Sequence, residues 1–249
     1  MKIAVISDIH GNLDAFREVL ADIDRSNVDA IISLGDNIGY GPEPEGVVRL
    51  IRKRKIPSVM GNHELVVADR RHLEWFNPIA RKSLQKTISM LSNDSINFIC
   101  GMKPYILCKK YRFVHGFPPD SPTTYLFHVS EEKLQEVFEQ MKEEICFIGH
   151  THELEIIGFD RRAISHPDEK AITRTPMHKG ITFLYDEKKY IINVGSVGQP
   201  RDGDNNSKYV IWDTLNYHIE VKYIPYDIAT VVNKIFKAGL PKAHANRLW

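Results

Sequence analysis

Carboxylate, carboxamide and imidazole side chains stand directly after several short apolar runs of this chain. The first run is rich in β-branched residues and stops at Ser7, after which Asp8 and His10 stand two residues apart on a turn. Because both side chains can point the same way, they form a suitable first half of a metal site. If the pair stood alone, a capping aspartate and a surface histidine would explain it better.

The same arrangement recurs four more times, which favours a shared site over the simpler explanation. The further residues that follow apolar runs are Asp36, Asn62, His63, His115, His150 and His152. Aspartates, an asparagine and several histidines without a thiolate suit Mn²⁺, Fe²⁺, Co²⁺, Ni²⁺ or Zn²⁺. Seven ligands, one fewer than the eight residues named, are already too many for one tetrahedral ion and suit two ions that share a carboxylate. Two such ions, about 3.5–4 Å apart, can hold a phosphoryl group and lower the pKa of a bridging water.

The elements around these residues predict one shared location for them. Apolar runs near residues 2–7, 30–34 and 57–60 alternate with helical patterns at 13–23 and 45–55. This alternation predicts βαβ units and a parallel sheet. In an open α/β sheet, ligands bind outside the carboxyl ends of the strands. The six histidines elsewhere are interpreted as structural or surface residues: His72, His128, His166, His178, His218 and His244.

The remainder of the chain predicts more helices and a second set of strands. A helical stripe spans 80–91, a hairpin joins 105–108 to 111–114, Ser130 caps a helix, and 145–148 is a strand. Further strands are expected near 181–185, 190–194, 209–213 and 219–223, and a helix at 228–237. Residues 153–180 are expected to form a strand followed by an irregular, basic loop. We expect one domain over 1–249, with motifs in 8–152, strands and a glycine-rich loop in 153–225, and a helical tail in 226–249.

Composition and charge exclude several classes of protein. The chain has 249 residues and a formal net charge of +1, so no excess of basic residues supports a stable nucleic-acid complex. The sequence contains no run of about 18 apolar residues, so no membrane-spanning helix is expected. The first apolar run is too short for a signal peptide. A cytoplasmic location is expected, with the three cysteines as buried, reduced thiols. No Gly-x-x-x-x-Gly-Lys-Ser/Thr motif is present, which excludes a P-loop NTPase.

Five ordered motifs resemble those of a known family. They are Asp8-x-His10, Gly35-Asp36, Gly61-Asn62-His63-Glu64, His115-Gly116 and Gly149-His150-x-His152. In this order they match the calcineurin-like metallophosphoesterases. The Gly-Tyr-Gly-Pro after Asp36 and the loop Gly-Ser-Val-Gly-Gln-Pro-Arg at 195–201 resemble the small prokaryotic phosphodiesterase branch. The resemblance implies an α/β fold, a four-layer αββα sandwich of two mixed sheets flanked by helices.

The resemblance also implies a role for each motif residue. The first metal ion would be held by Asp8, His10, Asp36 and His152. The second ion would be held by Asp36, Asn62, His115 and His150, with Asp36 as the bridge. Both would be divalent transition-metal ions, with Mn²⁺ expected first and Fe, Ni, Co or Zn as alternatives. The nucleophile would be a metal-bridging hydroxide without a covalent enzyme intermediate, and His63 would stabilise the charged transition state or protonate the leaving oxygen.

One position departs from the pattern of many relatives. They carry an aspartate three residues after the bridging one, which orients the catalytic histidine, whereas this chain has Gly39. The general-acid role of His63 is therefore less firmly implied than the ligand roles. Arg201, the one cation in the glycine-rich loop, could bind a phosphate oxygen or be a surface charge. Tyr40 could flank the leaving group or pack in the core.

Three classes of function remain open. The first is a two-metal phosphodiesterase acting on a small nucleotide or organic phosphodiester. The second is a phosphomonoesterase, a dinucleoside polyphosphate hydrolase or a protein phosphatase on the same site. The third is a non-catalytic binding or scaffold protein, which the complete ligand set disfavours. Gly39 and the 195–201 loop favour the phosphodiesterase. The basic residues Arg161, Arg162, His166, Lys170 and Arg174 form either a lid or, more in keeping with their composition, a solvated loop. The oligomeric state is left open.

Overall fold

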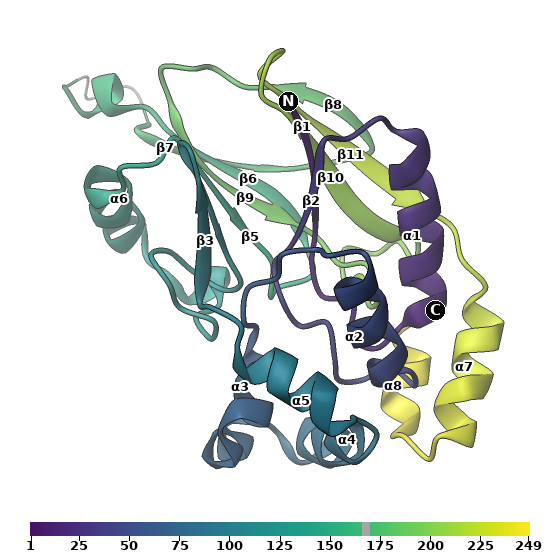
Figure 1. Cartoon of the computed structure of the whole chain (residues 1–249). Helices are drawn as coiled ribbons and strands as arrows, with labels where there is room; N and C mark the ends of the chain where they lie inside the picture. Colours follow the sequence, from purple (N-terminus) through teal and green to yellow (C-terminus); the bar gives the residue numbers. More distant parts are fainter. Residues whose placement is uncertain (166–169) are drawn as a thin grey trace.

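Two mixed β-sheets pack face to face in the computed structural model, which describes residues 1–165 and 170–249 (Figure 1). One sheet has the order β2-β1-β10-β11-β8, with β1 (Lys2–Ile6), β2 (Ala30–Ser33), β8 (Gly180–Phe183), β10 (Ser207–Asp213) and β11 (His218–Ile224). The other has the order β3-β4-β5-β9-β6-β7, with β3 (Tyr105–Cys108), β4 (Tyr111–Val114), β5 (Ile145–Ile148), β6 (Leu154–Phe159), β7 (Ile172–Pro176) and β9 (Lys189–Val194). Helices lie outside both sheets, which confirms the predicted sandwich.

Strand β1 lies between the second sheet and a helical layer. Its Ile3 and Val5 belong to the apolar cluster between the sheets, whereas Ala4 and Ile6 pack with α1 (Leu13–Arg25). Successive side chains of a strand point to opposite faces, so a strand covered on both faces must be apolar at every position. This requirement explains the continuous apolar run that precedes Asp8.

The six-stranded sheet is covered in the same way. Phe113 and Phe147 stack with ring centroids 5.1 Å apart in the cluster between the sheets, where Trp212 of the other sheet also lies. On the opposite face, Cys146 and its neighbours pack against α6 (Glu131–Gln140). The core between the sheets therefore fixes the position of the strand ends that carry the candidate ligands.

The helices of the described residues form three groups (Figure 1). Beside the five-stranded sheet are α1 and α2 (Pro44–Lys53), with α7 (Ile228–Lys237) and α8 (Lys242–Asn246) packed against each other next to them, and α6 covers the other sheet. The third group lies at one end of the sandwich and packs as a cluster of its own: α3 (Asn62–Ala68), α4 (Pro78–Ser89) and α5 (Asn93–Cys100). Short 3-10 helices are η1 (Arg70–Trp75), η2 (Leu126–His128) and η3 (Arg161–Ser165). Within the described chain, the helices are all too short or too polar to cross a bilayer.

The predicted strand at 57–60 is reduced to a pair of isolated bridges. Ser58 pairs with Ser33 and Val59 with Lys103, and the chain turns into α3 immediately afterwards. The helix starts here because the Glu64 carboxylate accepts the N–H of Gly61 at 3.1 Å, which completes the first turn. The motif at 61–64 thus lies at a helix N-terminus.

The segment 153–180 also differs from its prediction. Residues 172–176 form β7, which pairs with β6, so the expected irregular loop is wrong there. Threonine and isoleucine favour a strand, and Arg174 lies 3.5 Å from Glu155 on the neighbouring strand. Arg162 forms an ion pair with Asp160 at 3.2 Å. Both residues follow the C-terminal end of β6, whereas His152 precedes its N-terminal end, and this position agrees with the prediction of an ordinary surface loop. His166 lies outside the described residues.

The cysteines are only partly as predicted. All three are free, but Cys146 alone is buried, Cys108 is half-buried and Cys100 is exposed on α5. The prediction of buried thiols is therefore wrong for Cys100, which occupies the solvent side of an amphipathic helix. None of the three lies in the groups of acidic and imidazole side chains described below.

Candidate metal centre

The candidate ligands occupy backbone conformations that side-chain-bearing residues rarely adopt. Five of them have positive φ angles, namely Asp8 (53°), His10 (49°), Asp36 (50°), His150 (71°) and His152 (66°). A non-glycine residue in this left-handed region costs roughly 1 kcal/mol or more. The chain turns sharply as it leaves β1, β2 and β5, and these turns bring side chains of both sheets together. Such strain at one location is typical of a functional site.

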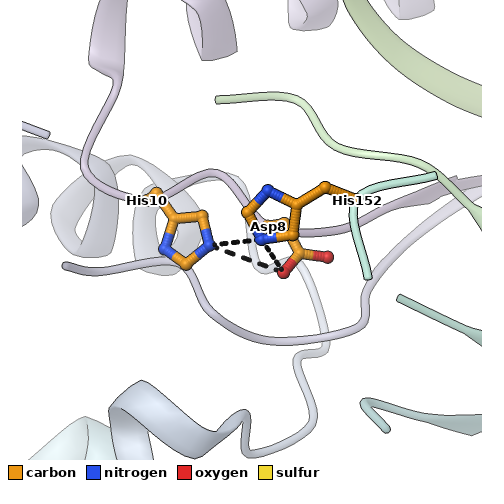
Figure 2. Close-up of side chains that lie close together, drawn as sticks. All are labelled: Asp8, His10 and His152. Carbon is orange, nitrogen blue, oxygen red and sulfur yellow. Dashed lines mark hydrogen bonds and ion pairs between the residues drawn. The ribbon is translucent and has the colours of Figure 1, made fainter. Parts of the chain in front are cut away.

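One cluster contains Asp8, His10 and His152 (Figure 2). The Nε2 atom of His152 lies 3.2 Å from Asp8 Oδ1, that of His10 lies 3.5 Å from the same oxygen, and the two Nε2 atoms are 3.0 Å apart. Each ring is oriented from its other side, because His10 Nδ1 pairs with the Ile38 carbonyl at 3.1 Å and His152 Nδ1 with the Gln199 carbonyl at 2.5 Å. With Nδ1–H donating to a carbonyl, the Nε2 lone pairs point at the carboxylate, as in metal-binding histidines.

A second cluster contains Asp36, His115 and His150, with Asn62 beside it. His115 Nε2 lies 3.0 Å from Asn62 Oδ1, 3.1 Å from His150 Nδ1 and 3.4 Å from Asp36 Oδ2. The Nδ1 of His115 pairs with the Leu34 carbonyl at 2.9 Å, so its Nε2 also points inward. An imidazole, a carboxamide oxygen and a carboxylate thus meet in one buried place.

Asp36 connects the two clusters. Its Oδ2 lies 3.8 Å from His10 Nε2 on one side and 3.4 Å from His115 Nε2 on the other. Its Oδ1 accepts the backbone N–H of His63 at 2.9 Å. The donor set fits two divalent ions that share one carboxylate. A further sign is that Asp8 Oδ1 accepts no hydrogen bond from the described residues although two imidazoles face it. The seven predicted ligands are all brought together, and their individual roles stay predictions.

Burial and charge control the ionisation of these groups. Burial opposes ionisation of Asp36, but the imidazoles of His115 and His63 outweigh it and hold the pKa of this carboxyl well below its usual value. Burial lowers the pKa of His150 to about 3 and that of His152 to about 4. His150 and His152 are therefore neutral at neutral pH, as a metal ion requires, whereas at His115 the carboxylates of Asp36 and Asp8 outweigh burial and raise the pKa to about 9 in the metal-free protein, so that binding of an ion there would displace a proton.

Glu64 supports the bridging residue and was given no role by the sequence. Its fully buried carboxylate accepts the N–H groups of Asp36 at 2.8 Å, Asn37 at 2.8 Å and Gly61 at 3.1 Å. Burial, together with the Asp36 carboxylate, raises the pKa of Glu64 to about 7. The signal that could have found it is the capping pattern of a glutamate at the third position of a helix.

Glu64→Gln is expected to destabilise the protein by about 3 kcal/mol, because in either orientation the new NH₂ group would face two N–H donors, those of Asp36 and Gly61 or the backbone and side-chain N–H groups of Asn37. Urea unfolding of the metal-free protein measures this change. Glu45→Gln is the matched control, since Glu45 accepts the N–H of Ser92 at 2.9 Å on the exposed surface. Equal, small effects of the two substitutions would contradict the supporting role of Glu64.

His63 is buried beside the clusters without a carboxylate on its outer side. Its Nε2 lies 3.7 Å from Asp36 Oδ2, and its Nδ1 has no hydrogen-bond partner in the described chain. Gly39 explains the departure noted in the sequence. A Cβ placed on Gly39, which has φ of +90°, would lie 1.9 Å from His63 Nδ1. No aspartate fits at this position while His63 keeps its place, and Phe76 packs edge-on against the ring, 5.2 Å away.

The two predicted substrate residues lie next to the clusters. Tyr40 is half-buried, and its ring centroid lies 4.5 Å from that of His10 and 4.6 Å from that of His63. Arg201 is exposed, and its backbone N–H donates to the His152 carbonyl at 3.2 Å. A cavity of about 380 Å³ is lined by Arg201 and by Arg247. Their positions are compatible with substrate contact, which remains a prediction for both.

Two further residues near the centre were missed by the sequence interpretation. His244 of α8, interpreted as structural or surface, is buried with its ring centroid 4.6 Å from that of Tyr40. Tyr125 stacks flat on His150, with ring centroids 3.8 Å apart. Both come from segments without a local signal, because only the folded chain brings them to the strand ends.

Comparisons with known proteins agree with this geometry. An uncharacterized protein from Methanocaldococcus jannaschii is 35% identical over 252 residues, covering 99% of this chain and 97% of that protein. The crystal structure of a metallophosphoesterase from Sphaerobacter thermophilus is 32% identical, with a TM-score of 0.81 over 100% of this chain and 98% of that chain. A hypothetical protein from Pyrococcus horikoshii has the same fold, with a TM-score of 0.77 at 15% identity over 100% of this chain and 97% of that chain.

The family model for the calcineurin-like phosphoesterase superfamily domain matches residues 1–216, a span that includes all five motifs. This family uses divalent metal ions, and the two clusters around Asp36 are groups that could hold them. The chain therefore belongs to the calcineurin-like phosphoesterase superfamily.

Proposed function

We propose that this chain is a two-metal phosphodiesterase that hydrolyses a small nucleotide or organic phosphodiester, acting as a single domain. The observation that carries the proposal is the position of Asp36, whose Oδ2 lies 3.8 Å from His10 and 3.4 Å from His115. One carboxylate within reach of two clusters is the arrangement that a pair of ions requires. When bound, two divalent ions polarise phosphoryl oxygens and lower the pKa of a water.

Residues beside the metal ligands would stabilise the transition state and bind the substrate. His63 lies beside Asp36 and His10, where it can stabilise charge on the phosphoryl group or deliver a proton to the leaving oxygen. Burial holds the pKa of His63 well below its usual value in the metal-free protein. Arg201 offers a guanidinium for a phosphoryl oxygen, and the half-buried Tyr40 limits the access of water between them.

A diester is favoured over a monoester by the spaces around the clusters. A diester carries an organic group on each side of its phosphoryl group, and each cluster has a cavity beside it. A cavity of about 150 Å³ is lined in part by Asn62 and His150 of the second cluster. The cavity of about 380 Å³ at Arg201 lies next to His152 of the first. A monoester would leave one of these spaces without a substituent.

The test is hydrolysis of bis-p-nitrophenyl phosphate and p-nitrophenyl phosphate side by side, using protein stripped of metal and resupplied with Mn²⁺, Fe²⁺, Co²⁺, Ni²⁺ or Zn²⁺. We expect no turnover without metal, restored turnover with Mn²⁺, and a kcat/KM about 10-fold or more in favour of the diester, equivalent to about 1.4 kcal/mol. A preference for the monoester would indicate a phosphomonoesterase on the same site. Bound metal without turnover of either ester would indicate a binding protein.

A further inference from the structure

A cavity with aromatic and polar walls opens beside the second cluster. It has a volume of about 150 Å³, and Asn62 and His150 of the cluster form part of its lining. Four of the seven remaining lining residues are aromatic, namely Tyr40, Trp75, Phe76 and Tyr125. A phosphoryl group held at Asp36 would therefore have one of its substituents directed at these rings. None of the described residues that line this cavity is an aspartate, glutamate, lysine or arginine.

Trp75 is the ring best placed to contact a ligand. It ends η1, and 63% of it is exposed although it is a large apolar side chain at the wall of a cavity. His72 lies against it, with ring centroids 4.2 Å apart. Phe76, the next residue, is turned edge-on to His63 and so connects the cavity wall to the catalytic side chain. An exposed tryptophan in this position favours a flat partner that can stack on it.

Polar groups at the same wall suit the edge of a heterocycle. The Asn77 carboxamide oxygen caps α4 by accepting the N–H of Ala80 at 3.0 Å, which leaves its NH₂ group for a ligand. Thr123 adds a hydroxyl on the other side of the cavity lining. A nucleobase presents ring nitrogens and exocyclic groups at its edge, which a carboxamide and a hydroxyl can contact. A lipid chain would not use these groups, and a second phosphate would find no cation here.

We infer that this cavity binds the nucleobase of a nucleotide ester whose phosphoryl group lies at Asp36. The inference rests on the proposed phosphoester hydrolysis and assigns one of the two substituents of the substrate to a nucleoside. Stacking on Trp75 supplies affinity, and Asn77 contacts the edge of the base. The other recess, with Arg201 and Arg247, then receives the remainder of the ester.

The first experiment compares adenosine 5′-monophosphate with ribose 5-phosphate as inhibitors of bis-p-nitrophenyl phosphate hydrolysis by the Mn²⁺-loaded protein. Both carry the same phosphate and sugar, so their difference isolates the base. We expect adenosine monophosphate to bind about 10-fold more tightly, the size of one aromatic–base stack. Trp75→Ala should remove this preference while leaving ribose 5-phosphate unchanged, and Trp75→Phe should retain most of it.

Phe183→Ala is the matched control. Phe183 is an equally exposed aromatic residue, at 69%, and it also lies beside a histidine, with its ring 5.5 Å from that of His218 on the outer strand pair. This variant should keep the preference of the wild type. Equal inhibition by the two phosphates in the wild type, or loss of the preference in Phe183→Ala as well, would overturn the inference.

A second readout does not depend on catalysis. Adenosine monophosphate should quench the tryptophan fluorescence of the metal-loaded wild type, and Trp75→Phe should lose the quenching although it still binds. Quenching in a protein without diesterase activity would support the nucleobase site and count against the proposed reaction. Diesterase activity without quenching or selectivity would support the reaction and overturn the nucleobase site.

Discussion

Asp36→Asn is expected to lower kcat/KM for bis-p-nitrophenyl phosphate by more than about 100-fold, beyond the loss typical of residues that only support a metal ligand. The carboxamide keeps the shape of the side chain. Its oxygen can still accept the backbone N–H of His63, which lies 2.9 Å from Asp36 Oδ1 in the wild type. It loses the negative charge that lies 3.8 Å from His10 Nε2 and 3.4 Å from His115 Nε2. A neutral amide bridges two divalent cations poorly.

Metal analysis of the purified variant separates loss of binding from loss of chemistry. We expect Asp36→Asn to hold fewer than two ions per chain under conditions in which the wild type holds two. Asp24→Asn is the control, because Asp24 is an exposed residue whose partner is Arg54 on the surface. Wild-type metal content with wild-type activity in Asp36→Asn would show that this carboxylate does not bridge the ions.

Gly39→Ala is expected to reduce activity nearly as much as His63→Ala, by about 100-fold or more for a lost general acid or charge stabiliser. The new methyl group would lie 1.9 Å from His63 Nδ1, so the ring has to leave its position. The backbone adds a smaller cost, because φ at this residue is +90° and an alanine there is strained by roughly 1–2 kcal/mol. The loss should therefore appear in turnover more than in stability.

The double variant tests whether the two losses have one cause. If Gly39→Ala acts by displacing His63, then Gly39→Ala combined with His63→Ala should be no less active than either single variant. Additive losses would mean that Gly39 acts elsewhere. Gly239→Ala is the control for strain alone, since this glycine also has a positive φ, 67°, but a Cβ there meets no described atom within 4 Å.

The choice of ester then identifies what His63 does. If His63 protonates the leaving oxygen, its removal should matter most for alkyl esters and much less for p-nitrophenyl esters, whose leaving group needs no proton. An equal loss on both kinds of ester indicates stabilisation of charge on the phosphoryl group. Kinetics of His63→Ala on thymidine 5′-phosphate esters with p-nitrophenol and with methanol distinguish the two.

The sequence predicts the parts of this site that depend on local order. Asp8 and His10 follow a run that must be apolar because both of its faces are covered, and this pattern is visible without a structure. The predicted hairpin of β3 and β4 and the predicted Ser130 cap are also confirmed. Both could be predicted because turn residues and capping residues act on backbone groups only a few positions away. Each of these signals is short in range.

Other features depend on contacts that no local pattern contains. The expected strand at 57–60 is reduced to two bridges, and α3 follows it, with a first turn in which Glu64 accepts the N–H groups of Gly61 and of Asp36, which is distant in the chain. The effect of Gly39 on His63 and the position of His244 against Tyr40 depend likewise on packing between distant segments. The cavity at Trp75 is assembled from five separate stretches of chain, so its existence could not be read from the periodicity of any one of them.

The pairing of β1 has a consequence for the biosynthesis of the protein. Strand β1 carries the first two candidate ligands and lies between β2, an early neighbour, and β10, whose Trp212 is paired with Ile3. The loop before β10 also stabilises the turn that follows β1, because Ser196 Oγ donates a hydrogen bond to the Asp8 carbonyl at 2.9 Å. Most of the chain must therefore have left the ribosome before Asp8 and His10 can reach their final positions. Non-local strand pairing of this kind also slows folding. A metal site at these residues would thus be completed only after most of the chain has been made.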